Sequence, residues 1–193
     1  MLITIFDYGA GNLHSLAKAA RSSGVNVHIT RIVEDALGSD AILLPGVGAF
    51  GSAMTFLEPY RERIRSALDD GLPCIGICLG MQLLFNSSEE GRGSGLGAIA
   101  GNVRRLEATR VPQIGWNTLE AARDPLLSSS GLTTAYFANS YVCEPVDREI
   151  VMAWATHEDD RFAAVVRAGK TRNIVLPALL LAAAAFAQPA DDS

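Results

Sequence analysis

The sequence Gly76-Ile77-Cys78-Leu79-Gly80 decides the expected fold of this 193-residue chain. An apolar run at 72–77 leads into it, and a helix-like stretch at 81–85 follows it. Gly-x-Cys-x-Gly between a strand and a helix predicts a sharp turn that exposes the cysteine, because glycines allow close backbone approach. The helix N-terminus is expected to favour the thiolate, which is the reactive form. We therefore expect Cys78 to be a nucleophile; the alternative is an ordinary buried cysteine.

Strands and helices alternate through the first half of the chain. We expect strands at 2–6, 25–29, 41–44 and 73–77, with helices at 13–21 and 56–68. This alternation predicts a mostly parallel sheet flanked by helices, with ligands bound at the carboxyl ends of the strands.

The second half has a different pattern. Short strand candidates follow one another at 103–106, 134–137, 151–156 and 163–167, after a glycine-rich connection at 91–101. They predict an antiparallel region added to an α/β core. We expect residues 1–169 to form one domain and residues 170–193 to be an atypical apolar tail.

The composition narrows the classes of function. The net charge is -5, so no basic field favours nucleic acid. The three cysteines are too few and odd in number for a disulfide framework, which suits the cytoplasm. Cys74 and Cys143 are expected to be packing residues. No cofactor, metal site or membrane association is expected, and the N-terminus is read as a buried strand rather than a signal peptide.

A second glycine loop, Pro45-Gly46-Val47-Gly48-Ala49-Phe50-Gly51, follows the strand at 41–44. It could be an ordinary loop. Because it lies at the same sheet edge as Cys78, we expect the backbone of Gly46, Val47 and Gly48 to form an oxyanion hole. The N–H group of Leu79, next to the nucleophile, would be a further donor.

Two polar residues lie close to the nucleophile in sequence. Gln82 is one helical turn beyond Cys78, on the same face, and could hold a polar substrate or be a simple helix former. Glu90 lies in the acidic turn Ser87-Ser88-Glu89-Glu90-Gly91, for which a solvated turn is the plain interpretation.

Together these segments carry a family resemblance. Gly-Ile-Cys-Leu-Gly-Met-Gln-Leu-Leu-Phe at 76–85 resembles the nucleophile segment of class I glutamine amidotransferases. Asp-Tyr-Gly-Ala-Gly-Asn-Leu at 7–13, the loop at 45–51, Pro-Gln-Ile-Gly-Trp-Asn at 112–117 and Tyr-Phe-Ala-Asn-Ser-Tyr at 136–141 are similar to the glutaminase subunit of imidazole glycerol phosphate synthase. The match covers about residues 1–169, in order.

The resemblance implies hydrolysis of glutamine, with ammonia passed to a cyclase subunit in a heterodimer of histidine biosynthesis. It implies that Cys78 is the nucleophile and that glutamine is held by Gln82, Glu90, Ser140 and Tyr141. It places Gly115, Trp116 and Asn117 near the partner interface. One departure lies inside these motifs: Asn139 stands where that subunit commonly has histidine.

The chain also departs from the family near its C-terminus. The family supplies its catalytic histidine and glutamate from Phe-His-Pro-Glu, whereas residues 170–181 read Lys-Thr-Arg-Asn-Ile-Val-Leu-Pro-Ala-Leu-Leu-Leu. The three histidines, His14, His28 and His157, match no catalytic position and are expected to be surface or structural. We therefore expect little or no glutaminase turnover.

The apolar tail and the function leave alternatives open. The fourteen apolar residues at 174–187 are too few for a typical membrane-spanning helix. Two explanations for the altered tail compete: a frameshifted or rearranged junction, or a pseudoenzyme in which the tail packs where the last strand and helix belong. The competing functions are another class I amidotransferase subunit (of the anthranilate or pyridoxal phosphate synthase type), a non-catalytic cyclase-binding partner, and an unrelated α/β elbow hydrolase.

Overall fold

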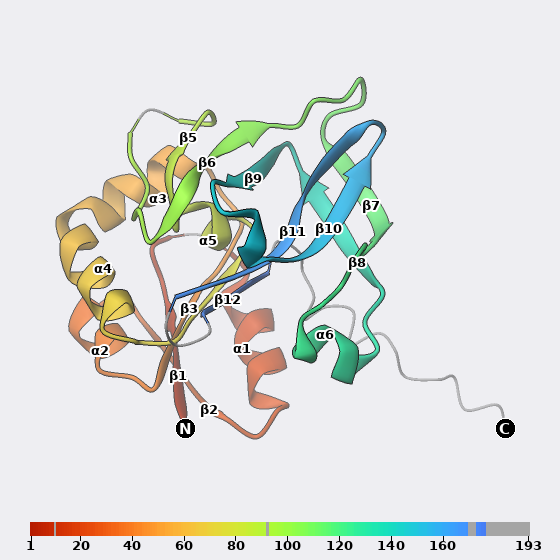
Figure 1. The fold of residues 1–193 in the computed structure, drawn as a ribbon. Helices are drawn as coiled ribbons and strands as arrows, with labels where there is room; N and C mark the ends of the chain where they lie inside the picture. Colours follow the sequence, from red (N-terminus) through yellow and green to blue (C-terminus); the bar gives the residue numbers. More distant parts are fainter. Residues whose placement is uncertain (10, 92, 170–172, 177–193) are drawn as a thin grey trace, which may run out of the picture.

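The computed structural model describes residues 1–9, 11–91, 93–169 and 173–176 (Figure 1). The first half comprises β1 (Leu2–Phe6), α1 (Leu13–Arg21), β2 (Asn26–Thr30), α2 (Val33–Leu37), β3 (Ala41–Leu44), α3 (Phe50–Leu57), η1 (Glu58–Tyr60), α4 (Arg61–Asp69), β4 (Cys74–Ile77) and α5 (Leu79–Gln82). The second half comprises β5 (Phe85–Ser88), β6 (Ile99–Arg105), β7 (Gln113–Thr118), α6 (Pro125–Ser130), β8 (Thr134–Asn139), β9 (Tyr141–Pro145), η2 (Arg148–Ile150), β10 (Val151–His157), β11 (Asp160–Ala168) and β12 (Asn173–Leu176).

The described strands form one large mixed sheet and a separate ribbon. The large sheet has the order β2-β1-β3-β4-β12-β11-β9-β6-β5, with β10 paired to β11. Strands β2, β1, β3, β4 and β12 run parallel, whereas β11, β9 and β6 are joined by antiparallel pairing. The predicted parallel core with an antiparallel addition is confirmed.

Alternating side chains on the parallel strands explain why helices cover both faces of the sheet. In β1, Ile3 and Ile5 join the cluster packed against α1, whereas Phe6 joins the cluster packed against α2, α3 and α4. Figure 1 shows α1 on one side of these strands and α2, α3 and α4 on the other. Strands apolar on both faces are typical of a parallel sheet buried between helices.

The antiparallel half has its own core. The ribbon β7–β8 packs on β10 and β11 through a second cluster of buried side chains that includes Phe137 and Phe162, whose rings are 5.7 Å apart. A buried ion pair adds to this packing. The Asp124 carboxylate caps α6 by accepting the Leu126 N–H and also accepts a 2.8 Å hydrogen bond from Arg167 of β11.

Two predicted helices differ from the observed ones. The helix predicted at 56–68 is instead α3, η1 and α4, because Pro59 lacks the N–H group that a continuous helix needs. The helix predicted at 81–85 is wrong beyond Gln82. Phe85 begins β5 and is fully buried, since this apolar run enters the core on all sides.

Part of the predicted C-terminal tail lies outside the described residues. Residues 170–172 and 177–193 are outside them, so the boundary at residue 169 stays a prediction. Residues 173–176 form β12 between β4 and β11. In the part of the chain that the structure describes, no helix is both long and apolar enough to cross a membrane.

The carboxyl ends of β3 and β4 touch through bare backbone. A Cβ atom on Gly46 would overlap the carbonyl oxygen of Ile77, and one on Gly80 would overlap the carbonyl oxygen of Leu44. Each of these glycines therefore follows one strand and lies against the end of the other. The glycine loop and the Cys78 turn are held together by contacts that no other residue type permits.

We predict that Gly46→Ala lowers the free energy of unfolding by about 3 kcal/mol or more, at the upper end for overpacking, because backbone atoms cannot move aside. Gly51→Ala is the matched control, since nothing lies within 4 Å of an added Cβ there and the residue is in α3. It should be neutral or stabilising by roughly 0.5 kcal/mol. Urea unfolding of both variants checks this, and equal effects would contradict it.

Candidate active site

Cys78 lies between β4 and α5 in a strained backbone conformation. Its φ is 50° and its ψ is -108°. Few residues other than glycine adopt such a positive φ, and this strain is typical of functional turns. The sharp strand-to-helix turn predicted for this cysteine is confirmed. It places the residue at the carboxyl edge of the parallel strands.

Burial controls the charge state of the Cys78 thiol. Burial raises the pKa of this thiol above its ordinary value, and the nearby Glu90 carboxylate raises it further. The Leu79 backbone N–H, which hydrogen-bonds to the sulfur, lowers the pKa but does not outweigh burial. The start of α5 therefore favours the thiolate as expected, but burial outweighs it, and the expectation that Cys78 is mainly a thiolate is wrong in this structure. Helix α5 spans only four residues, Leu79–Gln82, so its dipole is small.

The glycine loop that follows β3 is held beside this turn. Tyr8 is buried after β1, and its hydroxyl donates a hydrogen bond to the carbonyl oxygen of Pro45. Gly48 has a φ of 137°, which favours glycine, and the Val47 side chain is 53% exposed. The structure thus brings Gly46 next to the Ile77–Leu79 turn, and Val47 and Gly48 follow it directly in the loop. Sequence reasoning missed Tyr8, although its place directly after the first strand was a signal.

Glu90 lies at the other side of the same loop. Its carboxylate accepts a 3.2 Å hydrogen bond from the backbone N–H of Phe50, at the start of α3. A carboxylate at a helix N-terminus is stabilised by the unpaired N–H groups there. Glu90 is therefore a fixed, partly buried charge near Cys78 rather than a freely solvated acidic turn.

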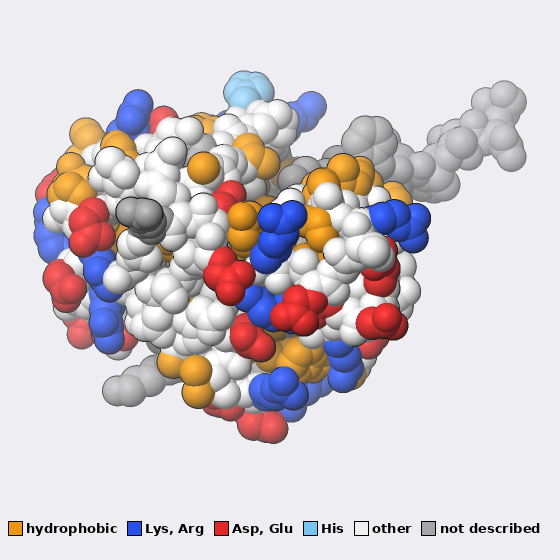
Figure 2. All heavy atoms as spheres, turned by 90° about the horizontal axis from the view of Figure 1, so that it is seen from above, with side chains coloured by type: hydrophobic (Ala, Val, Ile, Leu, Met, Phe, Trp, Pro, Cys, Tyr) orange, Lys and Arg blue, Asp and Glu red, His pale blue; other side chains and the backbone are white. Residues whose placement is uncertain are grey.

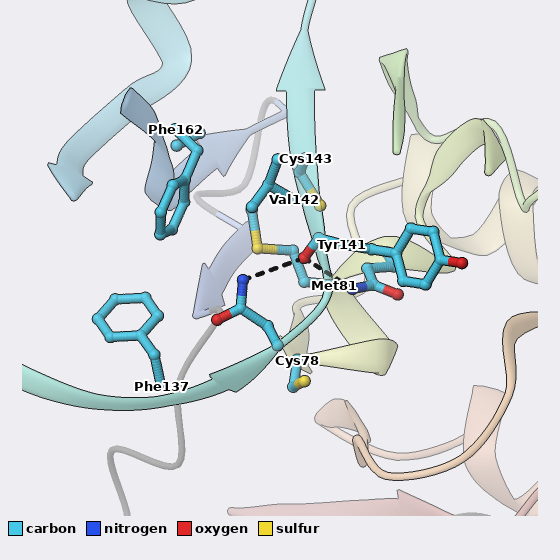
Figure 3. Close-up of a pocket in the computed structure, with 10 residues that line it drawn as sticks. Cys78, Met81, Phe137, Tyr141, Val142, Cys143 and Phe162 are labelled. Atoms are coloured by element: carbon cyan, nitrogen blue, oxygen red, sulfur yellow. Dashed lines mark hydrogen bonds between the residues drawn. The ribbon is translucent and has the colours of Figure 1, made fainter. Parts of the chain in front are cut away.

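A pocket of about 280 Å³, including its open mouth, lies against Cys78 (Figure 3). Its walls include Gln82 from α5 and Asn139 and Tyr141 from β8 and β9. Two amide groups converge on the Tyr141 carbonyl oxygen, from Asn139 Nδ2 at 3.2 Å and from Gln82 Nε2 at 3.5 Å. The predicted substrate residues Gln82 and Tyr141 thus lie together with Cys78.

Ser140 is placed between β8 and β9, where its carbonyl oxygen accepts a hydrogen bond from Leu106 N–H. It does not line the pocket, unlike its neighbours Asn139 and Tyr141. Sequence reasoning noted Asn139 only as a departure from the family and gave it no role.

The other two cysteines are buried, as predicted for packing residues. Burial raises the pKa of Cys74 to about 12 and the pKa of Cys143 well above its usual value. Cys143 lines the pocket beside Cys78. Among the described residues, no group of three or more His, Cys, Asp or Glu side chains could hold a metal ion.

None of the three histidines lies in this pocket. His14 is exposed on α1, and His28 on β2 is 3.8 Å from the Asp35 carboxylate at the surface. Ring atom Nε2 of His157 lies 2.8 Å from the carbonyl oxygen of Arg110, at the end of β10. The pocket as described therefore has no imidazole to accept a proton from Cys78.

An exposed apolar face lies on the ribbon β7–β8. Trp116 is 60% exposed and packs edge-on against Tyr136, with the ring centroids 5.7 Å apart. Ile114, on the same strand as Trp116, is 68% exposed. Gly115 has open space around it, whereas the Asn117 side chain donates to the Thr156 carbonyl oxygen at 2.8 Å and thus links β7 to β10. Asn117 therefore fixes β7 to the rest of the fold and is not itself part of the exposed apolar face.

The surface charge is mixed. On the face seen in Figure 2, acidic and basic side chains are interspersed and no single-sign field covers it. Opposite charges also pair at the surface of the described residues. An example is Arg63, whose Nη1 lies 2.8 Å from Oε1 of Glu34.

Comparisons with known proteins identify the family of this chain. The model of the glutamine amidotransferase class-I family matches residues 4–175. The imidazole glycerol phosphate synthase subunit HisH of Methanocaldococcus jannaschii is 46% identical over 154 residues, covering 78% of each chain. The same subunit of Natronomonas pharaonis is 40% identical over 172 residues, covering 85% of this chain and 80% of its own length.

Solved structures support the fold. A crystal structure of a glutamine amidotransferase superposes with a TM-score of 0.69 at 19% identity, covering 91% of this chain and 88% of the other. A glutamine amidotransferase from Thermotoga maritima gives a TM-score of 0.58 at 16% identity, covering 92% and 74%. The chain therefore belongs to the class I glutamine amidotransferases and, within them, to the family of the imidazole glycerol phosphate synthase subunit HisH.

Proposed function

We propose that this chain is a glutaminase subunit of an imidazole glycerol phosphate synthase, which converts glutamine to glutamate and ammonia for a cyclase partner in histidine biosynthesis. The strained Cys78 turn beside a glycine loop carries the proposal, because this arrangement serves acyl transfer. The relatives named imidazole glycerol phosphate synthase subunit HisH support it, because that name describes one subunit of a larger enzyme. The cytoplasm as its compartment stays a prediction.

The residues have distinct proposed roles. The Cys78 thiolate attacks the carboxamide carbon of glutamine, and the C–N bond breaks as the nitrogen takes up a proton and leaves as ammonia. Water then hydrolyses the resulting thioester to glutamate and the free thiol. Backbone N–H groups of the Gly46-Val47-Gly48 loop and of Leu79 stabilise the oxyanion. Glutamine itself is held by Gln82, Glu90, Ser140 and Tyr141. Of these, Gln82 and Tyr141 line the pocket, and Glu90 supplies a fixed negative charge that suits an α-ammonium group.

We further propose that the chain turns over glutamine poorly. The attacking thiol must lose a proton and the leaving nitrogen must gain one, and a histidine usually does both. No described histidine lines the pocket, and the printed sequence has no His-Pro-Glu. Removal of the triad histidine in subtilisin costs about 10⁶-fold in kcat.

A second candidate is a non-catalytic partner that binds the cyclase. Two observations favour it: the pocket lacks an imidazole, and the face around Trp116 and Tyr136 is exposed and apolar. Aromatic residues of this kind are enriched at protein interfaces. Binding and catalysis could therefore be separable in this chain.

We expect glutamate release from glutamine to be at least about 10³-fold slower than for a variant whose C-terminus is replaced by a family-type segment containing Phe-His-Pro-Glu, because that variant regains a general base. Both chains are assayed with the cyclase subunit and its nucleotide ligand. Cys78→Ser in the restored chain is the control and should abolish release. Equal rates for the two chains would overturn the proposed deficiency.

The pH dependence of Cys78 alkylation gives a second test. Because burial and Glu90 raise the thiol pKa, the thiol stays protonated at neutral pH and its thiolate fraction grows only as the pH rises past the ordinary thiol value. The rate with iodoacetamide, followed by mass spectrometry, should thus still be increasing above about pH 9. A rate that levels off below pH 8 would indicate a lowered pKa and contradict this.

The exposed aromatic face gives a third test. Trp116→Ala should weaken binding to the cyclase subunit by about 30-fold, the loss typical of a tryptophan at the centre of an interface. Val146→Ala is the control, since Val146 is 78% exposed on the loop after β9. Titration calorimetry with the cyclase subunit measures both, and equal affinities for the two variants would argue against this face.

A further inference from the structure

The side chain of Asn139 has one bonded end and one free end. Its Nδ2 donates a 3.2 Å hydrogen bond to the Tyr141 carbonyl oxygen. Its Oδ1 is buried and has no hydrogen-bond partner among the described residues. A buried acceptor without a donor lowers the stability of the fold by roughly 1–3 kcal/mol, so such atoms are rare and often mark a position where a water or ligand binds.

Exchanging the positions of Oδ1 and Nδ2 does not give the side chain a better set of hydrogen bonds. A flip would place Oδ1 against the Tyr141 carbonyl oxygen, so two acceptors would meet and the bond would be lost. The hydrogen bond to Tyr141, drawn as one of the dashed lines in Figure 3, therefore fixes the orientation of the amide. Oδ1 stays an acceptor in a residue that lines the same pocket as Cys78.

No donor among the described residues bonds Asn139 Oδ1, and its neighbours include another acceptor and apolar rings. Gln113 is its direct cross-strand neighbour on β7, is 4% exposed, and also has a buried oxygen, Oε1, without a partner. The rings of Phe137 and Phe162 also line the pocket (Figure 3). In such a low-dielectric site a hydrogen bond to Oδ1 would be stronger than in water.

The pocket restricts what could supply the missing donor. Its interior has room for about one water-sized molecule or group. The terminal –NH2 of a primary carboxamide has that size and carries two N–H donors. A carboxylate has no donor and would place a negative oxygen against Oδ1.

The nucleophile sets where a carboxamide nitrogen would lie. When its carbon reaches the Cys78 sulfur and its oxygen faces the Leu79 N–H, the nitrogen must lie on a different side of the carbon. Asn139 and Tyr141 come from β8 and β9 and line the same pocket as Cys78. A carboxamide nitrogen that points away from the loop backbone and into this pocket therefore comes near Asn139.

We propose that Asn139 Oδ1 accepts a hydrogen bond from the carboxamide nitrogen of glutamine and so selects glutamine over glutamate. The inference rests on the proposed function, since it takes glutamine as the ligand. Asn139 acts as a specificity residue, while Gln82 and Tyr141 hold the rest of the substrate.

The test compares binding of L-glutamine and L-glutamate by titration calorimetry, in a Cys78→Ser background that prevents hydrolysis. Asn139→Leu should lower glutamine affinity by about 10-fold and leave glutamate affinity unchanged or higher, because a single neutral hydrogen bond is lost. Asn102→Leu, on β6 away from the pocket, is the matched control and should keep the selectivity of the parent. Unchanged selectivity in Asn139→Leu would mean that water occupies the site and would overturn the inference.

A second measurement separates this inference from the proposed function. In chains that keep Cys78, a chloromethyl ketone shaped like glutamine should alkylate the sulfur: the S–C bond forms, the C–Cl bond breaks and chloride leaves. The ketone has no amide nitrogen, so Asn139→Leu should be captured at the same rate as the parent. Capture that is absent in the parent would overturn the glutamine site itself, whereas equal capture with unchanged glutamine selectivity overturns the role of Asn139 alone.

Discussion

The backbone contact between the ends of β3 and β4 is the constraint on which the rest of the site depends. Gly46 lies against the Ile77 carbonyl, and Gly80 lies against the Leu44 carbonyl. Neither glycine therefore has room for a side chain. This contact brings a loop of backbone N–H groups beside a cysteine in a strained conformation. Tyr8 and Glu90 then hold the loop from its two ends. The site is therefore built mainly from main-chain geometry.

The same packing has an electrostatic consequence. Burial that makes the Cys78 turn rigid also disfavours the thiolate, and Glu90 adds to the effect. A buried cysteine therefore needs a base brought to it from elsewhere in the fold. The residues that form the Cys78 turn and its glycine loop are thus separate in the sequence from the residue that would act as the base. A chain that lacks the base can therefore still bind a carboxamide.

Much of the core could be predicted from sequence because its strands are apolar on both faces. Strands β1 and β3 and helix α1 have the predicted bounds. Strand β7 was missed because its pattern is inverted: Gln113 is buried while Ile114 and Trp116 are exposed. Hydrophobic periodicity reports burial, so a strand that keeps its apolar side chains outside defeats it. The raised thiol pKa was missed because it depends on tertiary burial, which no local motif encodes.

The position of β12 in the sheet bears on how the chain acquires its structure during synthesis. β12 is the last described strand in the sequence, yet it pairs with β4 on one side and β11 on the other, in the middle of the sheet. A ribosome adding roughly 5–20 residues per second leaves β4 with an unpaired edge for several seconds while the residues up to 176 emerge. Open edges recruit other strands. Nascent chains of this protein are thus exposed to mispairing until the translation of β12 closes the sheet.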